Sequence, residues 1–220
     1  MMKHPAPYTD ALLPIMSNML PIGPALILDP FCGTGKIAHM STWRSSARFY
    51  GVEIEPEWTA QARASGCACV TGDSRLIPYS DAAFDAICTS PTYGNRMADH
   101  HEARDASPRH TYRHVLGRPL TEGNSGGMQW GDEYRALHVA VWTECRRVLK
   151  PGGVFVLDIK DHIRAGALQE VSAWHVDTLV ELGFVCVHRE QVPCPGQRHG
   201  ANGKLRVEYE NVFCFKKITR

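Results

Sequence analysis

The sequence DPFCGTG, residues 29–35, decides the fold. The apolar run just before it, residues 25–28, is typical of a short buried strand. Residues 36–43 can begin a helix, and the glycines at 33 and 35 allow a tight turn that brings backbone close to a ligand. Amide groups at the start of that helix would then face the ligand.

Acidic residues stand at the ends of three predicted strands. Asp29 ends the first strand, Glu53 ends residues 48–53, and Asp73 follows residues 67–70. A Gly-x-Gly turn alone also occurs as a plain connection. Three acids at successive strand ends instead indicate a nucleoside-binding α/β sheet, in which ligands sit at the carboxyl ends of the strands.

Strands and helices alternate along most of the chain, which favours a mostly parallel sheet. We expect further strands ending at Thr89 and over residues 154–159, 184–192 and 211–217, with helices over residues 56–65, 132–149 and 169–182. Pro151, Gly152 and Gly153 predict a turn between the long helix and the fifth strand. Residues 94–131 show little periodicity and predict a long functional or disordered loop.

Composition bounds the class of protein. The 220 residues suit one domain, and a net charge of +1 means that any basic surface must be local. No apolar run is long enough to span a bilayer, and the first residues lack a signal-peptide core. Cys69, Cys88, Cys186 and Cys214 lie in predicted strands, where we expect buried reduced thiols. These features predict a cytoplasmic protein with no membrane partner.

Two groups of side chains raise the question of a metal. Cys186, His188, Cys194 and His199 lie near one another in the sequence, but their spacing matches no common zinc pattern. The run His-His-Glu at residues 100–102 lacks the spacing of a helical ligand pair. We therefore predict no metal site.

The fourth predicted strand ends in a second motif, Ser90-Pro91-Thr92-Tyr93. Together with residues 29–35, it resembles the S-adenosylmethionine-dependent methyltransferases that methylate amino groups of DNA bases. The serine in first place is similar to the N4-cytosine type more than to the N6-adenine type. Residues 4–8, HPAPY, and residues 149–153, LKPGG, also resemble motifs of these enzymes. The resemblance implies a Rossmann-like class I fold: one domain, 1–220, with a seven-stranded, mostly parallel sheet, helices on both faces and an antiparallel last strand.

The resemblance also implies which residues hold the cofactor, S-adenosylmethionine. Glu53 would bind the ribose hydroxyls through a strong charged contact, and Asp73 would meet the adenine amino group. The full set of implied cofactor residues is His4, Pro5, Asp29, Phe31, Cys32, Gly33, Gly35, Glu53, Ile54, Asp73, Ser74 and Ser90.

The chemistry of methylating an exocyclic amine explains the second motif. The nitrogen lone pair is delocalised into the ring, and two acceptors that hold the amino hydrogens can localise it toward the methyl group. Ser90 Oγ and the Pro91 carbonyl would be these acceptors, and Tyr93 would stack on the base for roughly 1–3 kcal/mol. A duplex substrate would first have to swing the base out. Thr92 stands where the family usually has a second proline, and it relaxes the backbone there.

The segment 94–131 would be the substrate-recognition insert. Arginine suits phosphate and guanine recognition, and loop 193–208 could form a second wall of the same cleft. The implied substrate residues are Thr92, Asn95, Arg96, Arg104, Arg109, Arg113 and Arg198. A solvated surface loop is the alternative interpretation of the insert. The expected partner is DNA, with short or relaxed sequence specificity, or a homodimer.

Three alternatives stay open. Guanine-N2 RNA methyltransferases carry a similar motif, and Tyr93, Gly94 and Arg96 resemble theirs, which makes RNA the second choice of partner. A nicotinamide dehydrogenase on the same kind of sheet would need the third glycine of the dinucleotide fingerprint, which is absent. A non-catalytic cofactor-binding subunit would explain the departure at Thr92.

Overall fold

A computed structural model describes residues 9–94, 112–194 and 205–219 of the chain. Several expected site residues therefore lie outside the described residues, namely His4, Pro5, Asn95, Arg96, Arg104, Arg109 and Arg198. The backbone of Arg113 is described, but its side chain is not. Among the described helices, none is both long and apolar enough to cross a bilayer.

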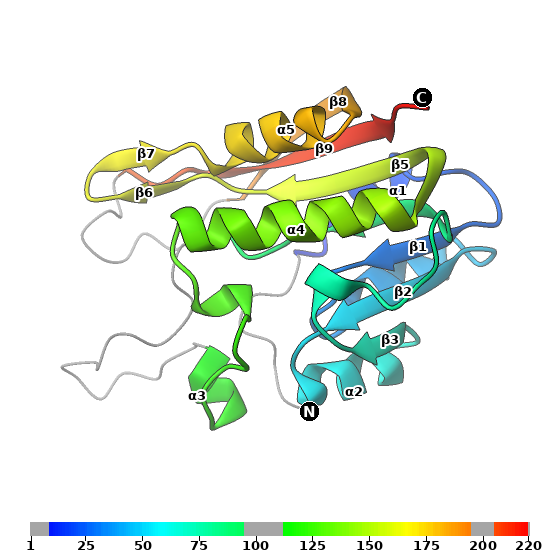
Figure 1. The fold of residues 1–220 in the computed structure, drawn as a ribbon, viewed down its shortest axis with the longest axis horizontal. Coiled ribbons are helices and arrows are strands. Elements are labelled where there is room, and N and C mark those ends of the chain that lie inside the picture. Colours follow the sequence, from blue (N-terminus) through cyan, green and yellow to red (C-terminus); the bar gives the residue numbers. More distant parts are fainter. Residues whose placement is uncertain (1–8, 95–111, 195–204, 220) are drawn as a thin grey trace.

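A seven-stranded sheet in the order β3-β2-β1-β4-β5-β9-β8 forms the centre of the molecule (Figure 1). The strands are β1 (Leu26–Asp29), β2 (Arg48–Glu53), β3 (Ala68–Thr71), β4 (Phe84–Thr89), β5 (Leu149–Ile159), β8 (Phe184–Pro193) and β9 (Tyr209–Lys217). β9 runs antiparallel to both of its neighbours, while the pairs from β3 to β5 are parallel. The mostly parallel sheet with an antiparallel last strand is confirmed.

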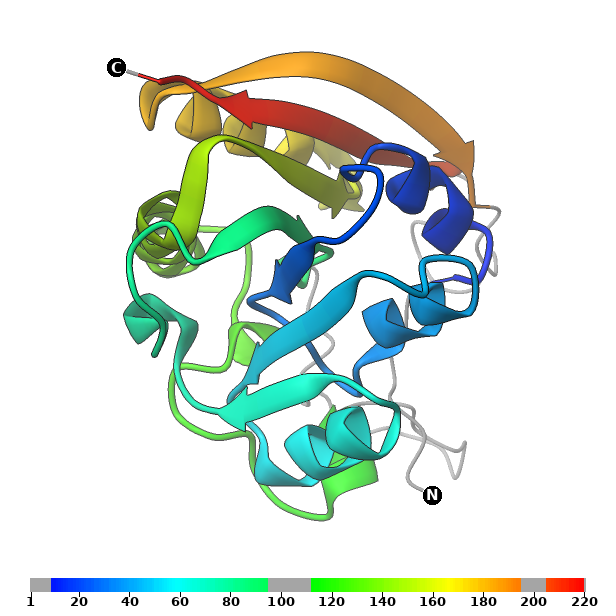
Figure 2. The ribbon, with the colours of Figure 1, turned by 90° about the vertical axis from the view of Figure 1, so that its right-hand side faces the viewer.

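Each face of the sheet carries its own apolar core, because successive strand residues point to opposite faces. Ile27 packs with α1 (Leu12–Asn18), η1 (Lys36–Thr42) and the end of α2 (Pro56–Ala64). Its neighbour Leu28 packs with α4 (Asp132–Val148) and α5 (Val171–Glu181). Figure 2 shows α1 and η1 on one side of the sheet and α4 on the other. The prediction of helices on both faces is confirmed.

Local sequence features predict the ends of α2 and α4 correctly. Pro56 occupies the first turn of α2, where a missing N–H costs nothing, and Gly66 follows its end with φ 88°. In α4 the predicted apolar positions, including Leu137, Val141 and Cys145, are buried against the sheet. Both helices end within one residue of the expected position.

The helix expected after residue 35 is present and is a 3₁₀ helix over residues 36–42. Two other local expectations are wrong in detail. Residues 151–153 lie inside β5, where the pairing with β4 shifts between Phe84 and Ala86, so these residues bulge the strand instead of ending it. The insert holds a short helix, α3 (Tyr112–Leu116), and a 3₁₀ turn, η3 (Ser125–Gly127), each held by tertiary contacts that periodicity does not report.

Two further differences lie after β5. A small hairpin of β6 (His162–Arg164) and β7 (Ala167–Gln169) precedes α5, so the helix begins at Val171 and not at Gln169. Cys186 is exposed on the edge strand β8, whereas Cys69, Cys88 and Cys214 are buried as expected. Residues 185–191 of β8 are all exposed, so both faces of this strand are open to solvent there, which its residue types do not reveal.

Replacing Gly35 with alanine should destabilise the fold by about 3 kcal/mol or more. Gly35 has φ 77°, and an added Cβ would lie 2.7 Å from Ala62 Cα, which is backbone of α2 and cannot move aside cheaply. The matched control is Gly66→Ala, because Gly66 has φ 88° with nothing within 4 Å of an added Cβ. That control should cost only about 1–2 kcal/mol. Denaturant unfolding of the two variants checks the difference, and equal costs would contradict it.

Candidate functional site

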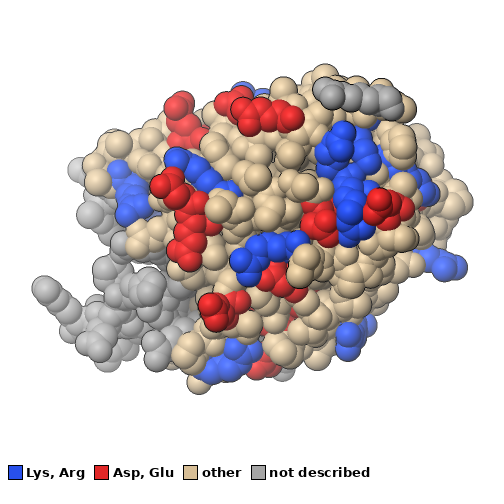
Figure 3. Space-filling model, viewed as in Figure 1, with Lys and Arg blue, Asp and Glu red and all other residues tan. Residues whose placement is uncertain are grey.

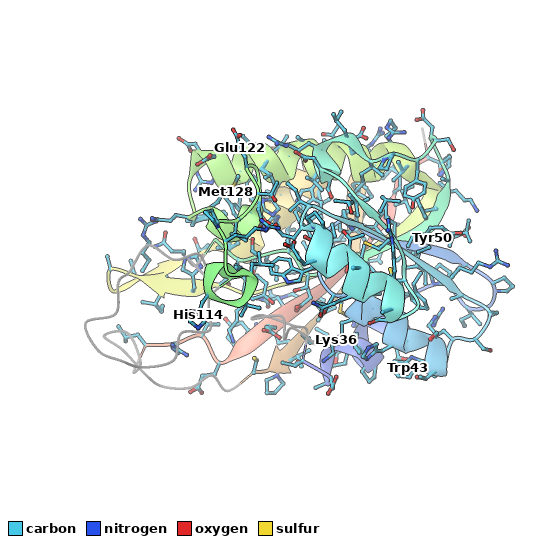
Figure 4. The ribbon with its side chains drawn as sticks, turned by 90° about the horizontal axis from the view of Figure 1, so that it is seen from below. Lys36, Trp43, Tyr50, His114, Glu122 and Met128 are labelled. Carbon is cyan, nitrogen blue, oxygen red and sulfur yellow. The ribbon has the colours of Figure 1, made fainter. Side chains whose placement is uncertain are left out.

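A cavity of about 220 Å³ opens at the carboxyl ends of β1 to β4. Figure 4 views the molecule from the side of α2 and α3, and the labelled Lys36 belongs to the cavity lining. The expected residues in the lining are Phe31, Cys32, Gly33, Glu53, Ile54, Asp73, Ser74, Ser90, Pro91, Thr92 and Tyr93. Residues that were not anticipated also line it: Thr9, Leu12, Pro30, Thr34, Lys36, Val52, Trp58, Gly72, Tyr112, Gly123, Asn124, Ser125, Leu137, Val141 and Glu210.

The turn after β1 is held by its own acid. Asp29 is fully buried, and its Oδ1 accepts hydrogen bonds from Phe31 N at 2.9 Å and from Thr89 Oγ1 at 2.6 Å. The second contact ties the end of β1 to the end of β4, where the Ser-Pro-Thr-Tyr motif begins. Asp29 and Gly35 are not part of the lining, so they shape the turn rather than form the cavity wall.

Glu53 sits where the expected ribose contact should be. Its carboxylate is buried and accepts hydrogen bonds from Gly33 N at 2.8 Å and Glu55 N at 2.9 Å. Burial raises the pKa of Glu53 to about 7. A carboxylate has about four acceptor positions. Two remain for a pair of ribose hydroxyls, so the site fits the nucleoside part of S-adenosylmethionine.

Asp73 reaches the same cavity from the end of β3. Arg75 Nη2 lies 2.5 Å from Asp73 Oδ2 and lowers the pKa of the carboxyl group. Next to it, the Ser74 hydroxyl donates to the Pro30 carbonyl and fixes this turn against the turn after β1. An ionised Asp73 suits an amino group such as that of adenine, and the adenine contact stays a prediction.

Glu55 was missed, although it organises one wall of the cavity. Its side chain is fully buried and accepts four hydrogen bonds from the insert. The donors are Arg118 Nη2 at 2.6 Å, Thr121 N at 2.8 Å, Thr121 Oγ1 at 2.9 Å and Asn124 Nδ2 at 2.7 Å. This anchor places the end of the insert, with Asn124 and Ser125, in the cavity lining. Only its position two residues after Glu53 could have drawn attention to it.

The Ser-Pro-Thr-Tyr motif forms the opposite wall and is held at both ends. Tyr93 Oη donates to Asp158 Oδ2 at 3.2 Å and lies 3.1 Å from Ser90 Oγ. Thr92 Oγ1 donates to Ser125 Oγ at 2.9 Å, and Thr92 O accepts from Tyr134 Oη at 2.6 Å. The backbone freedom expected at Thr92 is thus removed by its neighbours.

A buried histidine supports this loop from behind. Trp142 Nε1 can only donate, so His175 Nδ1, 3.0 Å away, must be an acceptor. The neutral ring then carries its hydrogen on Nε2 and donates to Tyr134 Oη at 3.0 Å, which in turn donates to Thr92 O. Burial lowers the pKa of His175 well below its usual value, which keeps the ring in this form.

Replacing Tyr134 with phenylalanine should lower the free energy of unfolding by about 2 kcal/mol, because Thr92 O and His175 Nε2 both lose their partner. Tyr79→Phe is the control, since no hydrogen bond of the Tyr79 hydroxyl is found among the described residues, and it should change stability by less than about 0.5 kcal/mol. Chemical denaturation measures both values. A Tyr134 variant as stable as the control would contradict the chain of donors.

Two buried acids lie beside the motif and were also missed. Asp158 is fully buried at the end of β5, and burial, with the nearby Glu210 charge, raises its pKa to about 8. Glu210 is 6% exposed at the start of β9 and lines the cavity. The sequence does not reveal that Asp158 and Glu210 are close, because β5 and β9 are distant in the chain and become neighbours only by pairing in the sheet.

Comparisons with known proteins agree with this arrangement. A family model described as a methyltransferase domain matches residues 28–105. A malonyl-(acyl-carrier protein) O-methyltransferase from Herminiimonas arsenicoxydans is 35% identical over 202 residues. That match covers 90% of this chain and 58% of the relative, so the chain spans less than two thirds of the relative's length.

Solved structures share the fold at low identity. An S-adenosylmethionine-dependent methyltransferase from Methanosarcina mazei has a TM-score of 0.60 at 14% identity, with 94% of this chain and 98% of that chain covered. A putative sarcosine dimethylglycine methyltransferase from Galdieria sulphuraria has a TM-score of 0.59 at 13% identity, with 96% and 83% covered. The cyclase SpnF reaches a TM-score of 0.62 at 15% identity, with 96% and 82% covered.

Four observations indicate the methyltransferase fold: the sheet order, the glycine turn, the acid at the end of β2 and the family match. The cyclase among the neighbours shows that the fold alone does not determine the reaction. The chain has the Rossmann-like fold of the class I methyltransferases, its residues 28–105 match a methyltransferase-domain model, and S-adenosylmethionine is its cofactor.

Proposed function

We propose that this protein transfers a methyl group from S-adenosylmethionine to the exocyclic amino group of a DNA base, N4 of cytosine in preference to N6 of adenine. The observation that carries the proposal is that the Ser90–Tyr93 loop borders the same cavity as Gly33 and Glu53. The pairing of β1 with β4 brings these two walls together. The methyl donor and the acceptor nitrogen can therefore meet in one enclosed space.

The hydrogen bonds of Ser90 suit the role of acceptor. Ser90 has one hydroxyl hydrogen, which it can donate to Asp158 or to Tyr93 Oη 3.1 Å away, and in either case the lone pairs stay on Ser90 Oγ. The Ser90 lone pairs can then receive an amino hydrogen of the base. With the amine oriented, its lone pair points at the electrophilic methyl group that the bound cofactor supplies, and alignment of this kind can contribute roughly 7–11 kcal/mol.

Methylation of a carboxylate oxygen is the second candidate, because the relative from Herminiimonas is named as an O-methyltransferase. The acids of the site argue against it. Glu210 is buried near the Ser90–Tyr93 loop, and an anionic acceptor brought there would meet its negative charge in a poorly solvated place. A neutral amine that donates hydrogen bonds suits these carboxyl groups better.

The surface is consistent with a partner that is bound locally. On the face shown in Figure 3, Lys and Arg alternate with Asp and Glu, without a broad basic area among the described residues. We therefore propose DNA contacts close to the cavity, with Thr92 at its wall and the insert beside it, or a second copy of the chain that extends the contact surface.

The test is to expose unmethylated random-sequence DNA to the purified protein with S-adenosylmethionine, digest it to nucleosides and identify the product by mass spectrometry. We expect N4-methylcytosine, or N6-methyladenine as the second choice. Matched reactions contain RNA and a malonyl thioester. N2-methylguanine in RNA would favour the RNA alternative, a methyl ester would overturn the amine proposal, and no transfer to any acceptor would indicate a non-catalytic subunit.

A further inference from the structure

Glu210 has a polar side chain in the cavity lining, and the chemistry proposed above assigns no role to it. Its carboxyl group is buried, it belongs to the cavity lining, and Oε2 has no hydrogen-bond partner among the described residues. A buried acceptor without a donor is costly. A ligand that brings an N–H into the cavity would remove this cost.

The sheet fixes where Glu210 points relative to the catalytic loop. Asp158 of β5 pairs with Val212 of β9, and Glu210 lies two residues before Val212, so Glu210 and Asp158 share one face as diagonal neighbours. Asp158 in turn accepts the hydrogen bond of Tyr93. Glu210 and the motif are therefore on the same side of the sheet edge and line the same cavity.

The neighbouring charges allow Glu210 to act as an acceptor. Burial and then the Glu210 charge raise the pKa of Asp158, while the hydroxyl groups of Ser90 and Tyr93 and the Lys160 charge oppose that rise. With a pKa of about 8, Asp158 is mostly protonated at neutral pH. A neutral Asp158 avoids placing two negative charges side by side.

We propose that Glu210 is a catalytic residue on the acceptor side of the cavity, where its carboxylate receives an N–H of the amino group that is methylated. This role rests on the proposed function. As the nitrogen lone pair forms the bond to the methyl carbon, the carbon–sulfur bond breaks and its electron pair stays on sulfur. The nitrogen becomes positively charged and releases one proton, which the Glu210 carboxylate takes up to become a carboxylic acid.

This role defines the acceptor as a nitrogen with at least two hydrogens, one for Ser90 and one for Glu210, which takes the place that the sequence assigned to the Pro91 carbonyl. Both an amino group on a base and a primary amine on a small molecule meet that requirement, but a carboxylate does not. Glu210 thus selects against the anionic acceptors that a related domain can use.

The test compares Glu210→Gln with Glu208→Gln, an exposed glutamate two residues earlier that is outside the cavity lining. On random-sequence DNA, Glu210→Gln should lower kcat/KM by roughly 10- to 1,000-fold, because the proton acceptor and one charged hydrogen bond are lost. The Glu208 variant should keep the wild-type value. Calorimetry with S-adenosylhomocysteine should give unchanged affinity for all three proteins. Glu210→Asp, which keeps the charge on a shorter side chain, should recover part of the rate.

The outcomes separate the two proposals. Wild-type protein that methylates no DNA overturns the proposed function and this role with it. Active wild-type protein with an equally active Glu210→Gln variant overturns this role alone. If both Glu210 variants lose S-adenosylhomocysteine binding as well as activity, Glu210 maintains the structure of the cavity. That result would also overturn the catalytic role.

Discussion

Replacing Glu53 with alanine is expected to weaken S-adenosylhomocysteine binding by about 100-fold or more, because two hydrogen bonds from ribose hydroxyls to a charged group are lost at roughly 1.5–3 kcal/mol each. The loss is larger than for an exposed acid because Glu53 is buried. Removing it also leaves Gly33 N without its acceptor in the turn that faces the ligand.

Calorimetric titration with S-adenosylhomocysteine measures this loss. Glu133→Ala is the control, since Glu133 is an exposed glutamate in the first turn of α4 and should leave the affinity unchanged. Circular dichroism establishes whether the Glu53 variant is folded. A folded Glu53 variant that binds as tightly as the wild type would contradict the assignment of the ribose site.

The same carboxyl group predicts a pH dependence of cofactor binding. Burial raises the pKa of Glu53 from 4.5 to about 7, so the group is protonated below that pH in the free protein. Only the ionised form can accept from both ribose hydroxyls while keeping its two backbone contacts. The affinity of the wild type should therefore rise as pH increases through about 7, while that of Glu53→Ala should stay flat. A flat wild-type profile would contradict a carboxylate contact to the ribose.

Tyr93→Ala should reduce methyl transfer by about 1,000-fold or more, because it removes both the ring that we propose stacks on the base, worth roughly 1–3 kcal/mol, and the hydroxyl group that contacts Ser90. The affinity for S-adenosylhomocysteine should stay within a few-fold of the wild type, since the ribose and adenine contacts lie on other strands. Transfer of labelled methyl groups to DNA and calorimetry measure the two quantities separately.

The matched variant is Tyr93→Phe, which keeps the ring and removes only the hydroxyl contacts to Ser90 and Asp158. It should retain most of the stacking and lose roughly 10- to 100-fold in rate, the effect of two neutral hydrogen bonds. If Tyr93→Ala weakens cofactor binding as much as it slows transfer, Tyr93 belongs to the cofactor side of the cavity.

Many of the residues proposed to bind the cofactor could be predicted to lie together, because the sequence features that identify them are local. The glycine turn, Glu53 and Asp73 each lie next to the strand that positions them, and parallel pairing brings the strand ends to one edge. The cavity lining therefore contains most of the expected residues.

The rest depends on contacts between distant parts of the chain. Glu55 and Asn124 meet across 69 positions, and the Glu210 charge reaches Asp158 only because β9 inserts beside β5. Residues 151–153 have turn chemistry, yet pairing with β4 draws them into a strand. In each case a tertiary contact outweighs the local preference, and a single sequence carries no record of that contact.

The anchor at Glu55 has a thermodynamic consequence. One fully buried carboxylate, two residues after Glu53, holds Arg118, Thr121 and Asn124, so the insert is joined at Glu55 to the turn that carries Glu53. A ligand that orders one of the two segments joined at Glu55 also restricts the other segment. A second ligand that binds there then loses less conformational entropy. We expect S-adenosylmethionine and the proposed nucleic-acid substrate to bind with positive cooperativity, and by reciprocity the release of either should weaken the binding of the other.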